Sequence, residues 1–319
     1  MKRIVLDADE EATDANFDEA RYLSANPDVR SAVSRGDFPS GRAHFNRFGK
    51  DEGRRLARKA PELSAVRGPK MERLRQFLRS DMEHHWTDDG KVSYITEALR
   101  QETQIVDTDN ISSHGYDAAV GAMIDKYEDG LLLDCGAGRR NIYYSNVVNF
   151  EIVDYDTTDV LGLGEYLPFR DNVFDAVISV AVLEHVHDPF KCAAEIARVL
   201  KRGGELFCCV PFLQPLHGYP HHYFNATSQG IRSLFESALD VTDVTVYPST
   251  HPVWAINWIL NSWAQGLSEK TREEFLSMRV SEFLAPPPSL LTQAFAADLS
   301  MEKQLELACA TVLTARKVK

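Results

Sequence analysis

Between residues 131 and 212, short apolar runs alternate with a helical pattern, and this alternation constrains the fold more than any other feature. Four runs have the length and composition of buried strands: "LLLDC", "NVVNFEIV", "FDAVISVAV" and "ELFCCVPF". The segment "DPFKCAAEIARVLKRGG" is typical of a helix that Asp188 caps and that has Pro189 in its first turn. Strands without a polar face that alternate with helices predict an α/β fold, a parallel sheet covered on both faces.

The rest of the chain extends this pattern in both directions. Tyr116, Val120 and Met123 recur at helical spacing after a serine cap. The expected elements outside the central pattern are a small helical unit (17–60), a linker (61–69), helix (70–100), two late strands (240–249 and 307–317) and a helical insertion between them (252–305). These patterns predict three parts: a helical module (1–60), a linker with helices (61–104) and the α/β domain (105–319).

The stretch "LLLDCGAGRR" runs from a strand into a glycine turn, and three cofactor loops compete for it. A phosphate-binding loop requires a lysine followed by serine or threonine, and none follows here. The dinucleotide fingerprint requires a third glycine where this chain has Asn141. The remaining pattern is D-x-G-x-G, with Asp134, Gly136 and Gly138. A carboxylate repels a pyrophosphate but attracts a sulfonium and an α-ammonium, so Asp134 favours S-adenosylmethionine.

A second acid is expected to bind the ribose of the cofactor. The second strand ends at Glu151, and a carboxylate there can accept hydrogen bonds from both ribose hydroxyls. Asp154 and Asp156 are alternatives for that role, or any of the three is a solvated loop acid. We favour Glu151 because the apolar run stops there.

Together, "LLLDCGAGRR", "NVVNFEIVDY" and "EYLPFRDNVFDAVISVAVLEHVHDPFKCAAEIARVLKRGG" resemble the class I S-adenosylmethionine-dependent methyltransferases. The resemblance covers about residues 113–250, with a last strand near 307–318. It implies a Rossmann-like, doubly wound, mostly parallel sheet of seven strands with a helical insertion before the last strand. The cofactor-binding positions that it implies are Asp134, Cys135, Gly136, Ala137, Gly138, Glu151, Leu163 and Gly164. "YLSANPDVRSAV" through "HFNRFGKDEGR" resembles a short module appended to various bacterial proteins.

Two positions depart from that family's pattern. The family often has an acid that meets the adenine amino group where this chain has Leu163, so a backbone group or Glu165 has to substitute. The small residues that usually follow the last glycine are replaced by Arg139 and Arg140. Either arginine clamps a carboxylate of the cofactor or the substrate, or lies on the surface.

Methyl transfer requires an acceptor atom held in line with the methyl group and, for an alcohol, a base. Two segments should reach the carboxyl edge of the sheet, where ligands bind in such folds. "LEHVH" offers Glu184, His185 and His187, and "PFLQPLHGYPHHYFNAT" offers His217, Tyr219, His221, His222 and Tyr223. The candidate bases are His185, His217 and His222, although His185 could only shape the cofactor edge.

We expect no metal, because no cysteine lies nearby and the adjacent His221 and His222 do not easily bind one ion. The net charge of −12 argues against nucleic acid as a partner. The expected acceptor is therefore a small molecule or a glycan, methylated on O or N. Trp254, Trp258 and Trp263 of the insertion would cover this acceptor, pack as a lid core or form a homodimer contact.

The N-terminus lacks the apolar core of a signal peptide, and "PVWAINWIL" is too short to span a bilayer. We therefore expect a cytoplasmic protein with no integral membrane segment. Two other functions stay open. Leu163 is compatible with a non-catalytic descendant that acts as a binding or scaffold module. A nicotinamide-dependent oxidoreductase has a similar sheet, but Asn141 and Asp134 count against it.

Overall fold

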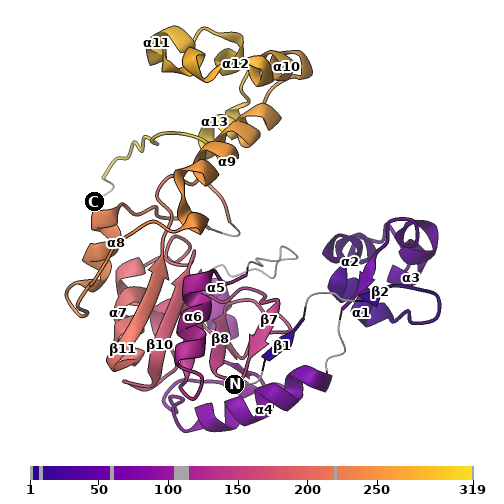
Figure 1. Cartoon of the computed structure of the whole chain (residues 1–319), viewed down its shortest axis with the longest axis vertical. Helices are drawn as coiled ribbons and strands as arrows, with labels where there is room; N and C mark the ends of the chain where they lie inside the picture. Colours follow the sequence, from indigo (N-terminus) through magenta and orange to yellow (C-terminus); the bar gives the residue numbers. More distant parts are fainter. Residues whose placement is uncertain (1–2, 7–9, 58–60, 104–114, 219–220, 318–319) are drawn as a thin grey trace.

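A seven-stranded sheet forms the centre of the molecule (Figure 1). The computed structural model describes residues 3–6, 10–57, 61–103, 115–218 and 221–317. The strand order is β11-β10-β6-β8-β9-β5-β4. These strands are β4 (His85–Trp86), β5 (Val92–Ser93), β6 (Leu132–Cys135), β8 (Val147–Glu151), β9 (Val160–Leu161), β10 (Phe174–Val180) and β11 (Leu200–Cys209). Every neighbouring pair is parallel except β4 with β5, so the mostly parallel sheet of seven strands is confirmed.

Helices cover both faces of this sheet. Successive side chains of a strand point to opposite faces. Leu132 packs in a cluster with α6 (Ala118–Lys126), and its neighbour Leu133 packs in another with α7 (Pro189–Val199). The chain is therefore doubly wound in the Rossmann-like manner.

Side-chain caps begin these helices where the sequence indicates polar residues. The Oδ1 atom of Asp188 accepts a hydrogen bond from the backbone N–H of Lys191, which confirms the predicted cap of α7. Asp117 caps α6 by accepting from the N–H groups of Ala119 and Val120. The predicted serine cap lies outside the described residues.

The two strands predicted near the C-terminus are wrong. Residues 240–247 and 308–317 form no regular element, so the helical insertion does not precede a last strand. Alternating β-branched residues form a strand only against a partner edge and a packed face. Val244, Val246, Val312 and Leu313 are instead exposed. The sheet reaches seven strands at its other end, through β9, β5 and β4.

The linker predicted at 61–69 is also wrong, because α4 (Pro61–Arg75) spans it. Gly68 and Pro69 suggest a break, but Val66, Met71 and Leu74 are buried in the core, and this packing overrides local propensity. The helix predicted over 70–100 stops at Arg75. The strands β4 and β5 follow it, and then α5 (Glu97–Thr103).

No helix connects β6 to β8, since residues 136–146 contain only the short strand β7 (Ile142–Tyr144). β7 pairs antiparallel with β1 (Arg3–Val5), and Tyr143 packs in one cluster with Leu63 and Val66 of α4. The Lys70 Nζ of α4 lies 2.6 Å from Asp159 Oδ2 and donates to the Val147 carbonyl at 2.6 Å. Strand β1 and helix α4 therefore cover the connection between β6 and β8.

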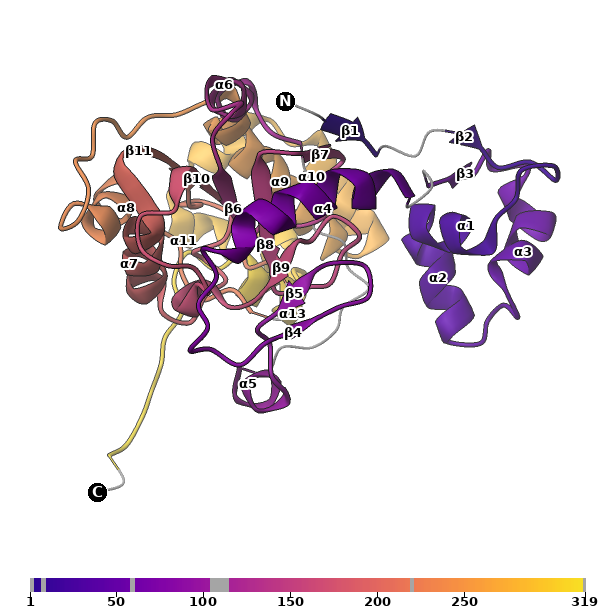
Figure 2. The same cartoon turned by 90° about the horizontal axis from the view of Figure 1, so that it is seen from below.

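Two further helical groups have cores of their own. The N-terminal group stands apart from the sheet (Figure 2). The N-terminal group contains α1 (Glu19–Ala25), α2 (Pro27–Ser34), α3 (Gly41–His44), the π-helix Phe45–Gly49, β2 (Glu10–Glu11) and β3 (Arg55–Leu56). After α8 (Ser228–Phe235), the C-terminal group contains α9 (Pro252–Gln265), α10 (Glu269–Ser277), α11 (Pro287–Leu290), α12 (Ala294–Ala297) and α13 (Met301–Glu306). Domain boundaries at 60 and 104 stay predictions. Within the described ranges, no helix has the length and apolarity that crossing a membrane requires.

Candidate functional site

Three neighbouring strands bring the predicted site residues to one edge of the sheet. β6 is parallel to β8 on one side and to β10 on the other. The segments that follow Cys135, Glu151 and Val180 therefore leave the sheet at the same edge. This edge holds both the glycine loop and the segment with Glu184 and His185.

The glycine loop is fixed against β8. The N–H groups of Gly136 and Ala137 both donate to the Phe150 carbonyl, at 2.9 and 3.0 Å. Gly136 has φ +79°, and a Cβ atom there would overlap the side chain of Val182. Gly138 also has a positive φ, of +60°. Residue 136 must be glycine for two reasons: its φ is positive, and Val182 leaves no room for a Cβ atom.

Asp134, the next-to-last residue of β6, is a completely buried, ion-paired carboxylate. Its Oδ2 lies 2.7 Å from Arg140 Nε and its Oδ1 lies 3.1 Å from Arg140 Nη2, and the Arg140 side chain is itself 1% exposed. Burial acts to lower the pKa of Arg140, but the Asp134 charge outweighs it, so the guanidinium stays charged. The Tyr116 hydroxyl also donates to Asp134, since burial and the Asp134 charge raise the pKa of Tyr116.

This pairing changes the role expected for Asp134. The sequence hypothesis gave this acid an uncompensated charge for the sulfonium cofactor, whereas Arg140 already neutralises it. Arg140 therefore clamps a carboxylate of its own chain. Arg139 does the same with Asp156, at 3.0 and 2.9 Å. The sequence does not identify Tyr116 as a site residue, because helical spacing alone does not show that its hydroxyl contacts Asp134.

Glu151 lies against the glycine loop at the end of β8. Its carboxylate accepts from the N–H of Gly138 at 2.6 Å and of Ile152 at 2.7 Å. Burial raises the pKa of the Glu151 carboxyl, although the hydrogen bonds from the backbone act in the opposite direction. The two alternatives are engaged elsewhere, Asp154 with Lys91 at 2.6 Å and Asp156 with Arg139. Glu151 is the acid that contacts the loop.

The position of the adenine-contacting acid remains apolar. The side chain of Leu163 is buried, and a Cβ atom at Gly164 would lie 2.7 Å from Cys192 Sγ. Glu165 is directed to the start of α7, where its Oε1 accepts from the N–H groups of His187 and Asp188 at 3.0 and 3.4 Å. Glu165 therefore does not take over this role in the structure.

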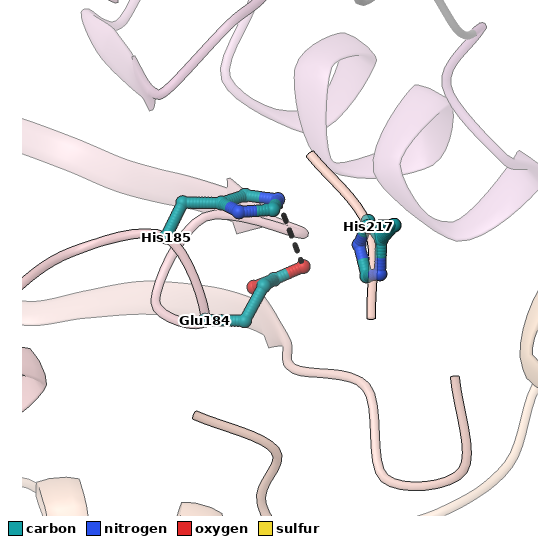
Figure 3. A group of neighbouring side chains, drawn as sticks. All are labelled: Glu184, His185 and His217. Carbon is teal, nitrogen blue, oxygen red and sulfur yellow. Dashed lines mark ion pairs between the residues drawn. The ribbon is translucent and has the colours of Figure 1, made fainter. Parts of the chain in front are cut away.

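The second half of the site is a cluster of Glu184, His185 and His217 (Figure 3). Glu184 is completely buried, and neither of its carboxylate oxygens has a hydrogen-bond partner in the described part of the chain. The Nε2 atom of His185 is 3.8 Å from Glu184 Oε1. Because a buried carboxylate without a donor is costly to ionise, burial raises the pKa of Glu184 to about 8.

Hydrogen bonds to the backbone fix the orientation of the two imidazoles. The Nδ1 atoms of His185 and His217 lie 2.8 Å from the carbonyl oxygens of His221 and Pro215, respectively. A carbonyl only accepts, so each Nδ1 carries the proton and each Nε2 keeps a lone pair. In addition, burial lowers the pKa of both His185 and His217.

His222 has the opposite arrangement. Its Nδ1 accepts from the backbone N–H of His217 at 3.1 Å, which leaves the proton on Nε2 for Asn225 Oδ1 at 2.9 Å. Both ring nitrogens of His222 are thus engaged, and this histidine positions His217 rather than offering a free base. His187 lies apart, with its ring 5.4 Å from that of Tyr223.

The C-terminal helices reach this cluster through one tryptophan. The Trp258 ring of α9 is 5.1 Å from the His217 ring. Trp254 is exposed, and Trp263 donates from Nε1 to the Phe295 carbonyl at 2.9 Å inside the helical group. The three tryptophans therefore have three different surroundings. Tyr219, another predicted candidate, lies outside the described residues.

A comparison with known families matches a segment that carries part of this site, including Glu151, Glu184 and His185. Residues 135–208 match a family model described as "Methyltransferase domain". An uncharacterized protein of Methanocaldococcus jannaschii is 35% identical over 106 residues, which are 28% of this chain and 46% of that protein. The demethylmenaquinone methyltransferase of Corynebacterium glutamicum is 47% identical over 53 residues, 17% of this chain and 23% of the enzyme. This chain thus spans less than half the length of these curated relatives.

Among solved structures, the chain is similar to Phospholethanolamine N-methyltransferase 2 of Haemonchus contortus, in complex with phosphomonomethylethanolamine and S-adenosylhomocysteine. The TM-score is 0.31 at 16% identity, over 59% of this chain and 51% of that one.

Proposed function

Because residues 135–208 form a class I S-adenosylmethionine-dependent methyltransferase domain, we propose that the protein methylates an O or N atom of a small-molecule or glycan acceptor. One observation carries this proposal. The glycine loop with Glu151 and the two imidazoles with free Nε2 atoms follow neighbouring strands at one sheet edge. Such an edge can hold a methyl donor beside a proton acceptor.

The residues of the loop fit S-adenosylmethionine. Gly136 and Gly138 leave the loop backbone without side chains, and the Glu151 carboxylate has the acceptor character that ribose hydroxyls require. The buried Leu163 offers an apolar surface in place of the usual acid. When bound, the cofactor supplies a methyl group that its sulfonium makes electrophilic.

His185 and His217 are the two candidate bases. Burial keeps the pKa of both below the usual range, so both imidazoles are neutral at neutral pH and can accept a proton at Nε2. A positioned base of this kind contributes about 10²- to 10⁴-fold to the rate. His222 supports the site by holding the backbone of His217.

The net charge of the chain and the ring of Trp258 favour a small-molecule or glycan acceptor. The net charge of −12 disfavours a polyanionic acceptor such as nucleic acid. The Trp258 ring beside His217 gives a flat apolar surface on which a ring-containing molecule can stack. A cytoplasmic location and a homodimer stay predictions.

The experiment is a turnover assay with the purified chain and S-adenosylmethionine that carries a labelled methyl group. Phenols, amines and sugars serve as acceptors, and mass spectrometry detects the demethylated cofactor and the methylated product. We expect acceptor-dependent turnover that falls at least about 100-fold in His217→Ala. His221→Ala is the matched control, because it removes an imidazole from the same loop and keeps the backbone carbonyl that holds His185. Cofactor binding without turnover on any acceptor supports the non-catalytic alternative.

A further inference from the structure

The Glu184 carboxyl is a buried polar group that no described residue of the chain satisfies. Both oxygens are shielded from solvent and have no hydrogen-bond partner among the residues that the structure describes. Leaving such a group unpaired is destabilising, and more so when it is charged. A group of this kind at a candidate site indicates a ligand that supplies the missing partner.

The groups around Glu184 are metal ligands in type and in orientation. One donor atom from each of Glu184, His185 and His217 lies within 4.8 Å of the other two. Figure 3 shows the Glu184 carboxylate directed between the two rings. Metal-binding histidines typically donate their other ring N–H to a carbonyl or carboxylate, which fixes the ring and the tautomer. His185 and His217 both do so, through Nδ1 at 2.8 Å.

We propose that Glu184, His185 and His217 bind one divalent transition-metal ion of the Zn²⁺ type. Two imidazole nitrogens and one carboxylate oxygen form a donor set that suits Zn²⁺, whereas Mg²⁺ and Ca²⁺ prefer oxygen ligands alone. Three protein ligands leave a fourth position open, as in catalytic zinc sites. This inference goes beyond methyl transfer, since the ion would bind with or without an acceptor.

The present distances require a small contraction. Ligand bonds of about 2.0–2.2 Å in a tetrahedral site place neighbouring donor atoms about 3.3 Å apart. The Glu184 Oε1 atom is now 3.8 Å from His185 Nε2, and all three donors lie within 4.8 Å. Side-chain rotations that move the donor atoms by about an ångström therefore bring them to ligand spacing. The prediction of no metal was based on the adjacent His221 and His222, whereas the histidines of this cluster are His185 and His217.

The position of the site suggests a use that rests on the proposed function. An acceptor hydroxyl in the open fourth position would have its pKa lowered by the ion. With the ion bound, the two imidazoles would hold it, and they would act as bases only in the metal-free protein.

The test is metal binding by the purified chain after chelator treatment. Isothermal titration with Zn²⁺ and visible absorption with Co²⁺ report stoichiometry and coordination. We expect one ion per chain, and a loss of affinity of at least about 100-fold in Glu184→Gln and in His217→Ala. His221→Ala should bind like the wild type, because its backbone carbonyl remains.

Glu184→Gln keeps the shape of the side chain, so circular dichroism of this variant separates loss of a ligand from loss of fold. Equal binding by the wild type, Glu184→Gln and His217→Ala would overturn the proposal, and so would no binding by a folded wild type. Neither result affects the turnover assay without added metal, so failure of the metal site and failure of the methyltransferase are distinguishable.

Discussion

Two buried carboxylates, Asp134 in β6 and Glu184 after the neighbouring parallel strand β10, have opposite surroundings. Both side chains are 0% exposed. Asp134 accepts two hydrogen bonds from Arg140 and one from Tyr116. Glu184 has no hydrogen-bond partner in the described residues and a pKa raised by burial to about 8. A buried charge requires compensation. Arg140 and Tyr116 already supply it for Asp134, whereas Glu184 is open to a ligand.

The largest effect that tests this comparison is expected at the paired acid. Asp134→Ala leaves the buried Arg140 guanidinium without its carboxylate, and we expect the free energy of unfolding to fall by about 3–5 kcal/mol. Urea denaturation measures it. The double variant Asp134→Ala with Arg140→Met removes both charges and should recover part of the loss. A single variant as stable as the wild type would show that the ion pair does not hold the loop.

Metal addition should have the second largest effect, and only through the other acid. Zn²⁺ at about 1,000 times its Kd stabilises a protein that binds it only when folded by about 4 kcal/mol. We expect the thermal midpoint of the chelator-treated wild type to rise with Zn²⁺ and that of Glu184→Gln to stay constant. A similar rise in both proteins would place the ion elsewhere.

Gly136 connects the two regions, because the space that its Cβ would occupy belongs to Val182, two residues before Glu184. Gly136→Ala combines this overlap with φ +79°, and we expect a loss of about 2 kcal/mol in stability, with weaker cofactor binding. Gly121→Ala in α6 is the control, since its Cβ would meet nothing within 4 Å. Equal stability of Gly136→Ala and the wild type would mean that the loop adapts freely.

The smallest effect is expected at Glu151, where the contribution is to binding. Glu151→Gln keeps the side-chain shape but replaces an acceptor of charge-assisted hydrogen bonds, and we expect the Kd for S-adenosylmethionine to rise about tenfold. Titration calorimetry measures this change, and Asp154→Asn is the matched control. An unchanged Kd would remove Glu151 from the cofactor site.

The sequence predicts what depends on local pattern and leaves out what depends on distant partners. The strands around Leu133 and Val177, the cap at Asp188 and the glycine loop follow from neighbouring residues, and the structure contains them. Residues 61–69 of α4 were predicted as a linker, because only tertiary packing stabilises a helix that contains Pro69. The C-terminal strands were wrong because alternation produces a strand only where the side chains also pack, and the alternating residues there are exposed.

The candidate site divides in the same way. Spacing alone brings Glu151 to the glycine loop and His185 to the sheet edge. No spacing shows that Arg140 neutralises Asp134, because Arg140 follows a glycine loop whose path depends on contacts with β8. Likewise, the different tautomers of His217 and His222 follow from backbone carbonyl and N–H groups that only the folded loop brings into contact.

The most direct test of the whole account is isothermal titration of the purified chain with S-adenosylmethionine and with its demethylated product. The account predicts one binding site for each, with a Kd in the micromolar range, or about −8 kcal/mol. Gly136→Ala should weaken both. No measurable binding of either compound to the folded wild type would contradict the assignment of the glycine loop as a cofactor site.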